Sequence, residues 1–278
     1  MRVDDALAWG TAELSGQESP ALDCRVLLCH VLDKPASFLF TWPEHVLTAA
    51  QQQTFCDLIA QRKTGTPVAY LTGQRDFWTL SLATSPSTLI PRPETELLVE
   101  AALERLPATA RRVCDLGIGT GAVALAIAAE RPELEVTGVD VVEEAVKLAQ
   151  HNAQRNHISN ARFVHSHWFD ALNDSYDMIV SNPPYVEHSS VYLKQGDVRF
   201  EPLSALISGE DGLDDIRYLI PQAKGYLNDG GSLLLEHGFA QGEAIRALFT
   251  ANGYTGVTTL KDFAGHDRVS LGFCKACD

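Results

Sequence analysis

The sequence predicts an α/β protein with a doubly wound, mostly parallel sheet of seven strands, preceded by a small helical domain and a β-hairpin connector. From residue 112 onward, apolar runs of strand length alternate with helix-like segments, as in a parallel sheet covered by helices. Residues 4–63 instead repeat their apolar side chains at helical spacing. We therefore expect three parts: a helical domain over 1–65, a hairpin linker over 66–90 and an α/β domain over 91–278.

Prolines divide the helical part. Pro20, Pro35 and Pro43 interrupt its periodicity, so we expect several short helices rather than one long one. This part contains neither a glycine-rich loop nor paired carboxylates. Its composition therefore favours substrate recognition over catalysis.

The connector differs in composition from both of its neighbours. Thr, Tyr, Phe and Trp cluster within residues 65–89, with turn signals at Thr72-Gly73 and Ser85-Pro86. This pattern predicts a β-hairpin.

The α/β part is read element by element from its apolar runs and turn residues. The expected strands are Arg112–Leu116, Glu135–Asp140, Ala161–His165, Tyr176–Ser181, Gly231–Glu236, Gly256–Leu260 and Asp267–Phe273. The expected helices are Glu94–Leu106, Gly121–Glu130, Glu143–Asn156, Asp214–Leu227 and Gln241–Asn252. Because no helix separates the last two strands, one of them is expected to run antiparallel.

Composition and charge exclude several classes of protein. The 278 residues are 45% hydrophobic and 21% charged, which is ordinary for a globular protein with a large core. No apolar stretch reaches the roughly 20 residues that span a bilayer, and the first residues are acidic, unlike a signal peptide. The formal net charge of −14 argues against stable nucleic-acid binding, which needs a clustered basic surface. We expect a cytoplasmic monomer without membrane attachment.

Cysteines and histidines do not indicate a metal site. The six cysteines are too sparse for a disulfide scaffold, so reduced thiols are expected. Cys274 and Cys277 have CxxC spacing but lie at the C-terminus without a second pair, so a frayed tail is favoured over a zinc or redox site. His165 and His167 would face the same side of a strand, yet no further ligand cluster accompanies them.

A glycine-rich loop follows the first strand of the α/β part. The stretch from Asp115 to Ala122, DLGIGTGA, joins this strand to the next helix, the context that a nucleotide loop requires. Glycines allow the backbone to approach a ligand at the helix N-terminus. Asp140 lies about twenty residues further on, at the end of the next strand, where a carboxylate can accept both hydroxyls of a ribose.

The loop alone leaves two cofactors open, because Gly117, Gly119 and Ala122 also satisfy the dinucleotide pattern with alanine in its third position. Asp115 favours S-adenosylmethionine. Its carboxylate would repel a pyrophosphate but attract the α-ammonium and sulfonium groups of S-adenosylmethionine. The alternative interpretation is that Asp115 caps the loop through backbone N–H groups.

The stretch SNPPYV, residues 181–186, follows another expected strand. Pro183 and Pro184 lack backbone donors, so this turn presents mainly carbonyl acceptors around the Asn182 side chain. The Asn182 side-chain oxygen and the Pro183 carbonyl can accept both N–H bonds of a planar amide or exocyclic amine, while Tyr185 covers its flat face. The alternative is that the two prolines simply end a strand.

Ligands of such a sheet bind beyond the carboxyl ends of the strands, so a methyl donor at the glycine loop and an NH2 acceptor at Asn182 can share one crevice. An amide nitrogen is a poor nucleophile, and orientation is therefore the expected source of rate. No strong general base lies in the motif, and proton loss to solvent is the simpler assumption.

These features together resemble the class I S-adenosylmethionine-dependent methyltransferases that modify planar nitrogens. Further motifs narrow the resemblance to the peptide chain release factor glutamine-N5 methyltransferases, over nearly the whole chain. The motifs are TLIPRPETE over 88–96, DLGIGTG over 115–121, SNPPY over 181–185, QGDVRFEP over 195–202 and LEHG over 235–238.

The resemblance implies methylation of the glutamine in the Gly-Gly-Gln motif of class 1 release factors, with these release factors as protein partners and S-adenosylmethionine as cofactor. It also implies that the N-terminal helices help to dock the release factor. We expect cofactor contacts from Asp115, Gly117, Ile118, Gly119, Thr120, Gly121, Asp140, Trp168, which walls the adenine pocket, and Asn182. We expect Asn182, Pro183, Pro184 and Tyr185 to bind the glutamine, with Asn182, Pro183 and Tyr185 as the catalytic set. The family often has an acid where this sequence has His167, so an adenine contact from that position is in doubt.

Other functions stay open at this point. A ribosomal-protein glutamine-N5 methyltransferase would share the cofactor loop and the Asn-Pro-Pro-Tyr site, although the PRPET stretch over 91–95 speaks for the release-factor enzyme. A nucleic-acid amine methyltransferase is disfavoured by the acidic charge. A non-catalytic binding module is opposed by the intact glycines, Asp140 and Asn182.

Two smaller groups of charged and titratable residues lie outside these motifs or at their edges. Asp197, Arg199 and Glu201 either order a loop near the substrate or form an internal salt bridge that shapes the loop. His237 beside Glu236 is interpreted as a satisfied histidine at a strand end rather than an acid–base catalyst.

Overall fold

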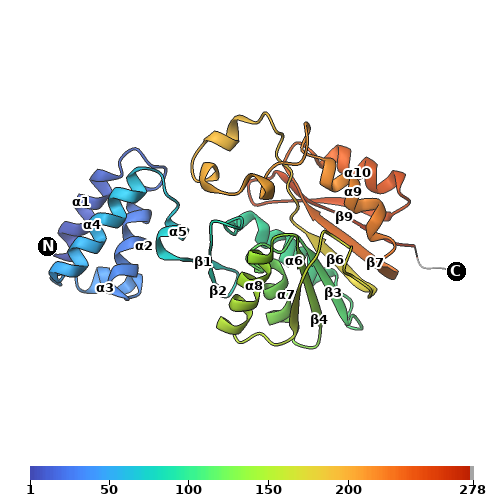
Figure 1. The fold of residues 1–278 in the computed structure, drawn as a ribbon, viewed down its shortest axis with the longest axis horizontal. Coiled ribbons are helices and arrows are strands. Elements are labelled where there is room, and N and C mark those ends of the chain that lie inside the picture. Colours follow the sequence, from blue (N-terminus) through green and yellow to red (C-terminus); the bar gives the residue numbers. More distant parts are fainter. Residues whose placement is uncertain (276–278) are drawn as a thin grey trace. The chain divides into compact units, whose positions relative to one another are not determined.

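The computed structural model describes residues 1–275, and the chain divides into two compact units (Figure 1). The first unit consists of Met1–Gln74 together with Tyr192–Phe200, and the second contains Arg75–Val191 and the chain from Glu201 onward. The first unit is thus built from two separate stretches of sequence. Within residues 1–275, no helix combines the length and apolar character needed to cross a bilayer.

The first unit is a group of short helices with its own core. Its helices are α1 (Val3–Glu13), α2 (Pro20–Leu32), α3 (Ala36–Thr41), α4 (Ala49–Lys63) and α5 (Val68–Thr72), with the 3-10 turns η2 (Val191–Lys194) and η3 (Val198–Phe200) at its second stretch. Pro20 begins α2 and Pro35 caps α3, so the expected division by prolines is confirmed. Leu27, Leu28 and Phe55 are fully buried in the core between these helices.

The connector is only partly the expected hairpin. Strands β1 (Gln74–Phe77) and β2 (Leu80–Ala83) form a two-stranded sheet, but α5 precedes them where strand was predicted. Pro67 stands at the N-cap of α5, and Gly73 ends this helix in the left-handed region, with φ 71°. The Thr72-Gly73 signal therefore marks a helix end rather than a hairpin turn.

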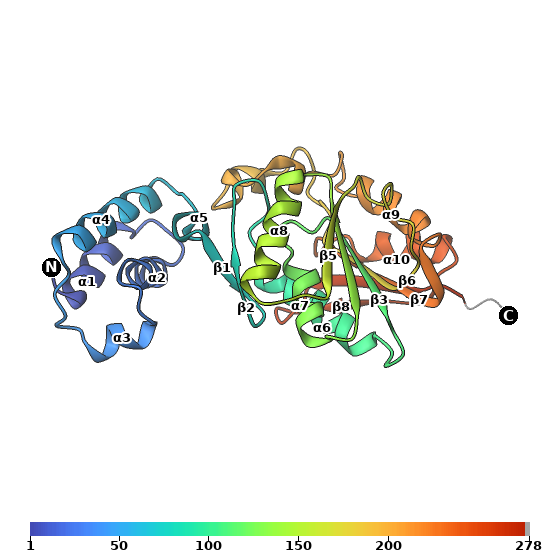
Figure 2. The ribbon, with the colours of Figure 1, turned by 60° about the horizontal axis from the view of Figure 1, so that its bottom comes forward.

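The second unit contains a seven-stranded sheet in the order β5-β4-β3-β6-β7-β9-β8 (Figures 1 and 2). Its strands are β3 (Arg112–Leu116), β4 (Glu135–Asp140), β5 (Ala161–His165), β6 (Tyr176–Ser181), β7 (Leu227–Glu236), β8 (Thr255–Lys261) and β9 (Asp267–Phe273). Its helices are α6 (Glu96–Arg105), α7 (Ala122–Glu130), α8 (Glu143–Arg155), α9 (Asp214–Ala223) and α10 (Gly242–Ala251), with 3-10 turns η1 (Pro93–Thr95) and η4 (Leu203–Ala205). Neighbouring strands from β5 to β7 are parallel, and β9 is antiparallel to both β7 and β8, which confirms the predicted doubly wound fold.

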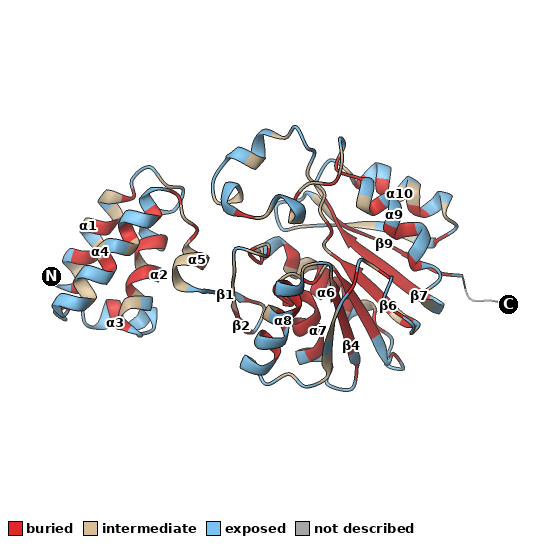
Figure 3. Ribbon diagram, in the orientation of Figure 1, coloured by how far each residue is buried: buried red, intermediate tan, exposed pale blue. Residues whose placement is uncertain are grey.

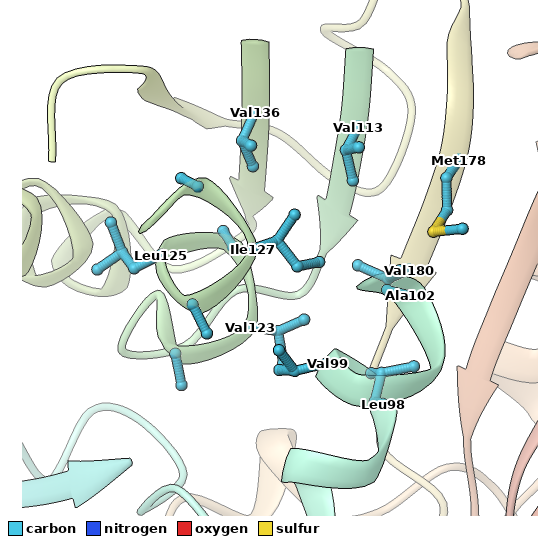
Figure 4. Packing of buried hydrophobic residues seen from close by; sticks show 14 of the residues in the cluster. Leu98, Val99, Ala102, Val113, Val123, Leu125, Ile127, Val136, Met178 and Val180 are labelled. Atoms are coloured by element: carbon cyan, nitrogen blue, oxygen red, sulfur yellow. The ribbon is translucent and has the colours of Figure 1, made fainter. Parts of the chain in front are cut away.

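Side chains of alternate residues along β3 enter two different cores, because successive side chains of a strand point to opposite faces. Val113 packs in the cluster formed with α6 and α7, while the adjacent Cys114 packs in the cluster formed with α9 and α10. Figure 4 shows Val113, Val136 and Val180 of the sheet facing α6 and α7. Both faces of the central strands are thus covered, and Figure 3 shows these strands as buried.

The predicted end of α9 and the predicted start of β7 are both wrong, because β7 begins earlier than expected. Helix α9 ends at Ala223 rather than at Leu227, and β7 begins at Leu227 rather than at Gly231. The register of β7 against β6 shifts between Tyr176 and Met178, and Gly230 has φ 74°. The glycine-rich stretch that resembles a turn is therefore accommodated as an irregularity inside the strand.

The sheet brings three strand ends together. Leu116, the last residue of β3, is in register with Val139 of β4 and with Ser181 of β6. The Ser181 hydroxyl also donates to the Leu116 carbonyl over 2.6 Å. The glycine loop after β3, Asp140 at the end of β4 and Asn182 after β6 consequently lie at one edge of the sheet, as expected.

Candidate active site

The glycine loop bends sharply between β3 and α7. Gly117, Gly119 and Gly121 have φ values of 76°, 52° and 84°, in the region that side chains other than glycine rarely adopt. Gly121 is the N-cap of α7, and a Cβ placed there would lie 3.0 Å from the Cβ of Ala149. The sequence needs glycine at this position both for the backbone conformation and for the close approach of α8.

Asp140 holds the loop in place. Its Oδ2 accepts a hydrogen bond from Gly119 N over 2.9 Å, and its Oδ1 accepts one from Val142 N over 2.9 Å. Burial raises the pKa of Asp140, while these backbone donors oppose the rise. Each carboxylate oxygen has a further lone pair. Asp140 can therefore order the loop and still accept a hydrogen bond from a ligand.

Asp115 lies at the base of the same loop and is only 2% exposed. Its Oδ2 accepts a hydrogen bond from Ala124 N over 3.0 Å, so the side chain does cap the start of α7. Burial raises the pKa of Asp115 to about 7, although the Ala124 hydrogen bond acts in the opposite direction. Because Asp115 also lines the cavity described next, capping and ligand contact are compatible.

A cavity of about 350 Å³ lies over this edge of the sheet. Nine of the predicted site residues line it: Asp115, Gly117, Ile118, Gly119, Thr120, Asp140, Trp168, Asn182 and Pro184. Gly121, Pro183 and Tyr185 are not among its lining residues. The cavity therefore collects the loop, the acid after β4 and the Asn182 segment into one site.

Trp168 forms one wall of the cavity in an unusual backbone conformation, with φ 48°. Ser166 holds it there, because the Ser166 hydroxyl donates to the Trp168 carbonyl over 3.0 Å and accepts from Ala171 N over 3.0 Å. A Cβ added at Gly117 would be 3.4 Å from the Trp168 ring. The indole thus lies directly beside the glycine loop.

His167 also lines the cavity, at the position where the family often has an acid. Its side chain is 58% exposed, and its Nδ1 lies 3.6 Å from Asp170 Oδ2. The imidazole ring is near the rings of Trp168 and Tyr218. His167 is therefore in reach of a ligand beside Trp168, with a carboxylate next to it.

The Asn182 side chain is oriented by Thr95. Its Nδ2 donates to Thr95 Oγ1 over 3.2 Å, and both residues line the cavity. With Nδ2 used in this hydrogen bond, Oδ1 is the atom with which Asn182 can accept an N–H from a ligand. The role of Asn182 as an acceptor for a ligand amide stays a prediction.

Pro183 and Tyr185 are directed into the protein. Pro183 is buried, and the Tyr185 hydroxyl donates to Glu236 Oε1 over 3.3 Å. Burial and the nearby Glu236 raise the pKa of Tyr185 well above its usual value. The cover that Tyr185 was expected to place over a bound amide, and the contact from the Pro183 carbonyl, remain predictions.

The segment just before α6 contributes cavity residues that the sequence did not predict individually. Thr88, Arg92 and Thr95 line the cavity, and Arg92 forms an ion pair with Glu201, whose side chain is fully buried. The only signal was the TLIPRPETE stretch, which indicated the resemblance but no individual role. Polar side chains of this segment therefore belong to the candidate site.

The acidic and basic residues over 197–201 do not pair with one another in the way considered above. Asp197 pairs with Arg62 over 2.7 Å within the first unit, and Arg199 donates to the Thr64 carbonyl over 3.0 Å. Glu201 instead pairs with Arg92 in the second unit. Glu201 also accepts a hydrogen bond from Ile90 N over 3.1 Å, so these residues fix the loop through contacts with separate parts of the chain.

His237 and Cys274 are buried in the second unit. His237 is fully buried, and its Nδ1 and Nε2 bond the Gly238 carbonyl and the Ser270 hydroxyl over 2.9 and 2.8 Å, as expected for a satisfied histidine. Within residues 1–275, no group of three or more His, Cys, Asp or Glu side chains is arranged to hold a metal ion. Cys274 is a buried free thiol, and Cys277 lies outside the described residues.

A doubly wound seven-stranded sheet with this loop, an acid at the end of β4 and an Asn-Pro-Pro-Tyr segment after β6 defines an S-adenosylmethionine-dependent methyltransferase. Two family models match the chain: the PrmC N-terminal domain over residues 5–73 and the methyltransferase small domain over residues 93–197. With the curated relatives described next, these matches show that the chain belongs to the release factor glutamine methyltransferase family.

Curated relatives support this membership over almost the full length. A release factor glutamine methyltransferase of Pseudomonas aeruginosa is 52% identical, with 94% of this chain and 95% of the relative covered. One from Vibrio cholerae is 50% identical, with 97% and 96% covered. A solved methyltransferase from Pyrococcus furiosus has a TM-score of 0.54 at 21% identity, covering 83% of this chain and 100% of that one, and it supports the fold.

Proposed function

We propose that the protein transfers a methyl group from S-adenosylmethionine to the side-chain amide nitrogen, N5, of the glutamine in the Gly-Gly-Gln motif of class 1 release factors. The observation that carries the proposal is the orientation of Asn182. Its Nδ2 is held by Thr95 in the wall of the same cavity that contains the glycine loop and Asp140. An amide-bearing side chain can therefore meet an acceptor oxygen next to the cofactor loop.

The residues of the cavity fit S-adenosylmethionine. Asp140 has lone pairs left for ribose hydroxyls, Trp168 offers a flat apolar wall for an adenine, and Asp115 offers a carboxylate for a cationic group. When bound, S-adenosylmethionine supplies an electrophilic methyl group on its sulfonium. The glycine loop has no lysine or arginine for a pyrophosphate, and Arg92 in the cavity wall is paired with Glu201. The carboxyl groups of Asp115 and Asp140 favour the positively charged cofactor.

Asn182 performs the orientation that the reaction needs. An amide nitrogen has a delocalised lone pair, so its attack depends on alignment more than on intrinsic nucleophilicity. Acceptance of one glutamine N–H by Asn182 Oδ1 would fix the plane of the carboxamide. Holding two reactants in line can lower a barrier by about 7–11 kcal/mol, which makes orientation a sufficient main source of rate.

The first unit is the proposed docking domain for the release factor. It carries exposed apolar side chains at Leu22, Phe40, Trp42 and Val46, which are 54–69% exposed. Exposed aromatic residues of this kind are enriched in protein interfaces. We also propose that the protein acts as a cytoplasmic monomer without stable nucleic-acid binding, in line with its net charge of −14.

The direct test is methylation of purified release factor. The protein is incubated with S-adenosylmethionine and a class 1 release factor, and the Gly-Gly-Gln peptide is analysed by mass spectrometry for a single added methyl group. A release factor with glutamate in place of that glutamine has no amide nitrogen and serves as the matched control. Methylation of a ribosomal protein or of DNA instead, with unmodified release factor, would reject the proposal.

A further inference from the structure

A buried carboxyl group lies behind the acceptor segment and has no role in the mechanism described so far. Glu236 is the last residue of β7 and is 1% exposed. Its Oε1 accepts the Tyr185 hydroxyl over 3.3 Å, while its Oε2 is buried without a hydrogen-bond partner among residues 1–275. Because an unpartnered buried carboxylate oxygen is costly, its presence next to the site calls for a functional reason.

Thr95 connects this carboxyl to Asn182. Thr95 is 4% exposed, and its Oγ1 accepts Asn182 Nδ2 over 3.2 Å. The Thr95 hydroxyl is also close enough to Glu236 to lower the pKa of the carboxyl, and its proton can rotate toward the unpartnered Oε2. A threonine hydroxyl has one proton. When that proton is directed to Glu236, Thr95 can only accept from Asn182, and Nδ2 must face Thr95.

We infer that Glu236 is a positioning residue for methyl transfer, which fixes the orientation of the Asn182 side-chain amide through the Thr95 hydroxyl so that Oδ1 faces the glutamine. The inference rests on the proposed function and deepens it. An ionised carboxylate only accepts hydrogen bonds. Thr95 then donates to Glu236 and accepts from Asn182, so each hydrogen bond in this chain has a fixed donor and acceptor. Tyr185 donates to the same carboxylate, so Glu236 anchors two residues of the Asn-Pro-Pro-Tyr segment.

Protonation of Glu236 would allow the donors and acceptors in this chain of hydrogen bonds to exchange roles. A protonated carboxyl can donate to Thr95, which then can donate to Asn182 Oδ1 and turn Nδ2 toward the glutamine NH2 group. Two donors would then face each other. The acceptor site is therefore correct only while Glu236 is ionised.

The groups around Glu236 place its titration near neutrality. Burial raises the pKa of Glu236 to about 7, and Glu94 from η1 acts in the same direction. Arg268 from β9 and the hydroxyls of Thr95 and Tyr185 lower it, and Arg268 is itself bonded to Asp262 over 3.1 Å. The neighbouring His237 is occupied by Gly238 and Ser270. With a raised pKa, Glu236 is ionised above about pH 7 and protonated below it.

The test is Glu236→Gln, which keeps the shape of the side chain but can donate as well as accept. We expect kcat for the release factor, at saturating S-adenosylmethionine, to fall by about 10- to 100-fold, the range for a misoriented reactant. The dissociation constant of S-adenosylmethionine should stay within about twofold, because Glu236 does not line the cavity. The wild-type kcat should fall below about pH 7, and this fall should be absent in Glu236→Gln.

Thr95→Val provides a second route if Glu236→Gln does not fold. Valine has no hydroxyl to link Asn182 with Glu236. Thr95→Val should therefore lower kcat as Glu236→Gln does, and its kcat should no longer fall at low pH. Thr95→Ser should have the wild-type kcat and the wild-type fall at low pH. Thr137→Val is the matched control, since Thr137 is similarly buried, at 2%, and bonds Arg162 away from the cavity. It should keep the wild-type kcat. The double variant Thr95→Val with Glu236→Gln should be no slower than the slower single variant.

Several outcomes would overturn the inference. One is a wild-type kcat in either Glu236→Gln or Thr95→Val. Another is that kcat still falls at low pH in both variants. A third is that the losses of kcat add up in the double variant. A parallel loss of S-adenosylmethionine binding would show a structural role instead. A wild-type protein that leaves release factor unmethylated would reject the proposed function, a result that is separate from any difference between the variants.

Discussion

At the scale of single residues, the charge of the Asp115 side chain can be changed by varying the pH near neutrality. It is buried at the base of the glycine loop, with its pKa raised to about 7, and it lines the cavity. A cationic ligand binds better to the ionised form, so affinity should be full above about pH 7 and fall as the pH drops through this value. An α-amino group has a pKa of about 7.7–8.0, so the α-ammonium of S-adenosylmethionine is mostly protonated up to about pH 7.5.

We therefore expect the dissociation constant of S-adenosylmethionine to rise below pH 7, by at most about tenfold per pH unit. Calorimetric titration between pH 5.5 and 7.5 measures it. Asp115→Asn should bind more weakly at pH 7.5 and show little pH dependence. Because burial also raises the pKa of Asp140, a slope that persists in Asp115→Asn would assign the effect to another group, with Asp140 the first to examine.

A variant of Asn182 tests whether the methyl donor and the glutamine are bound by separate residues. Its amide is held by Thr95, whereas the glycine loop is ordered by Asp140. Asn182→Ala should lower kcat by about 100-fold or more, since it removes the proposed acceptor for the glutamine amide. The affinity for S-adenosylmethionine, measured by calorimetry, should change little. A large loss of cofactor affinity would contradict this division of roles.

At the scale of elements, α4 is tied to two other parts of the first unit through one arginine. Arg62 is 7% exposed and pairs with Asp23 of α2 and with Asp197 of the second stretch, each over 2.7 Å. Arg62→Met would leave Asp23 buried without its cation, so we expect a loss of about 3–5 kcal/mol in the stability of the first unit. Chemical denaturation measures this loss.

Asp197→Asn is the matched variant for this element. The Asp197 side chain is 34% exposed, whereas that of Asp23 is 12% exposed. A partly exposed ion pair contributes about 0–1 kcal/mol, so Asp197→Asn should be much milder than Arg62→Met. Equal losses from both variants would show that burial of Arg62 against Asp23 does not dominate.

The elements also show how far sequence patterns can predict this fold. β3, β4, β5, β6 and β9 have the predicted ends, because their apolar runs are bounded by clear turn residues. α5 and the irregular start of β7 were missed, since Thr72-Gly73 and the stretch over 228–231 are typical of turns in either context. Local chemistry does not distinguish a helix end or a strand irregularity from a hairpin turn.

The residues of the candidate site also differ in whether the sequence could predict them. Asp115, Asp140 and Asn182 were predictable, because each lies near the carboxyl end of a strand and such ends meet at one edge of a parallel sheet. Thr95 and Glu236 were not, although Glu236 was noted beside His237. Their roles depend on hydrogen bonds between η1, β7 and the segment after β6, which lie far apart in the sequence. Spacing within one segment contains no signal for such a contact.

At the scale of the whole molecule, the two units have separate hydrophobic cores. Leu27 and Phe55 belong to the core of the first unit, whereas Val113 and Ile220 belong to the two clusters of the second. All residues that line the cavity lie in the second unit. A ligand of this cavity should therefore stabilise the second unit selectively, because a ligand stabilises the folded part that binds it.

Differential scanning calorimetry provides the measurement. We expect two unfolding transitions, of which S-adenosylmethionine at about 100 times its dissociation constant stabilises one by about 2.7 kcal/mol, or about 5 to 10 °C. Arg62→Met should lower the other transition and leave the ligand-dependent one in place. A single transition that S-adenosylmethionine and Arg62→Met both move would mean that the two cores unfold together, and the stability of the first unit would then depend on ligand binding in the second.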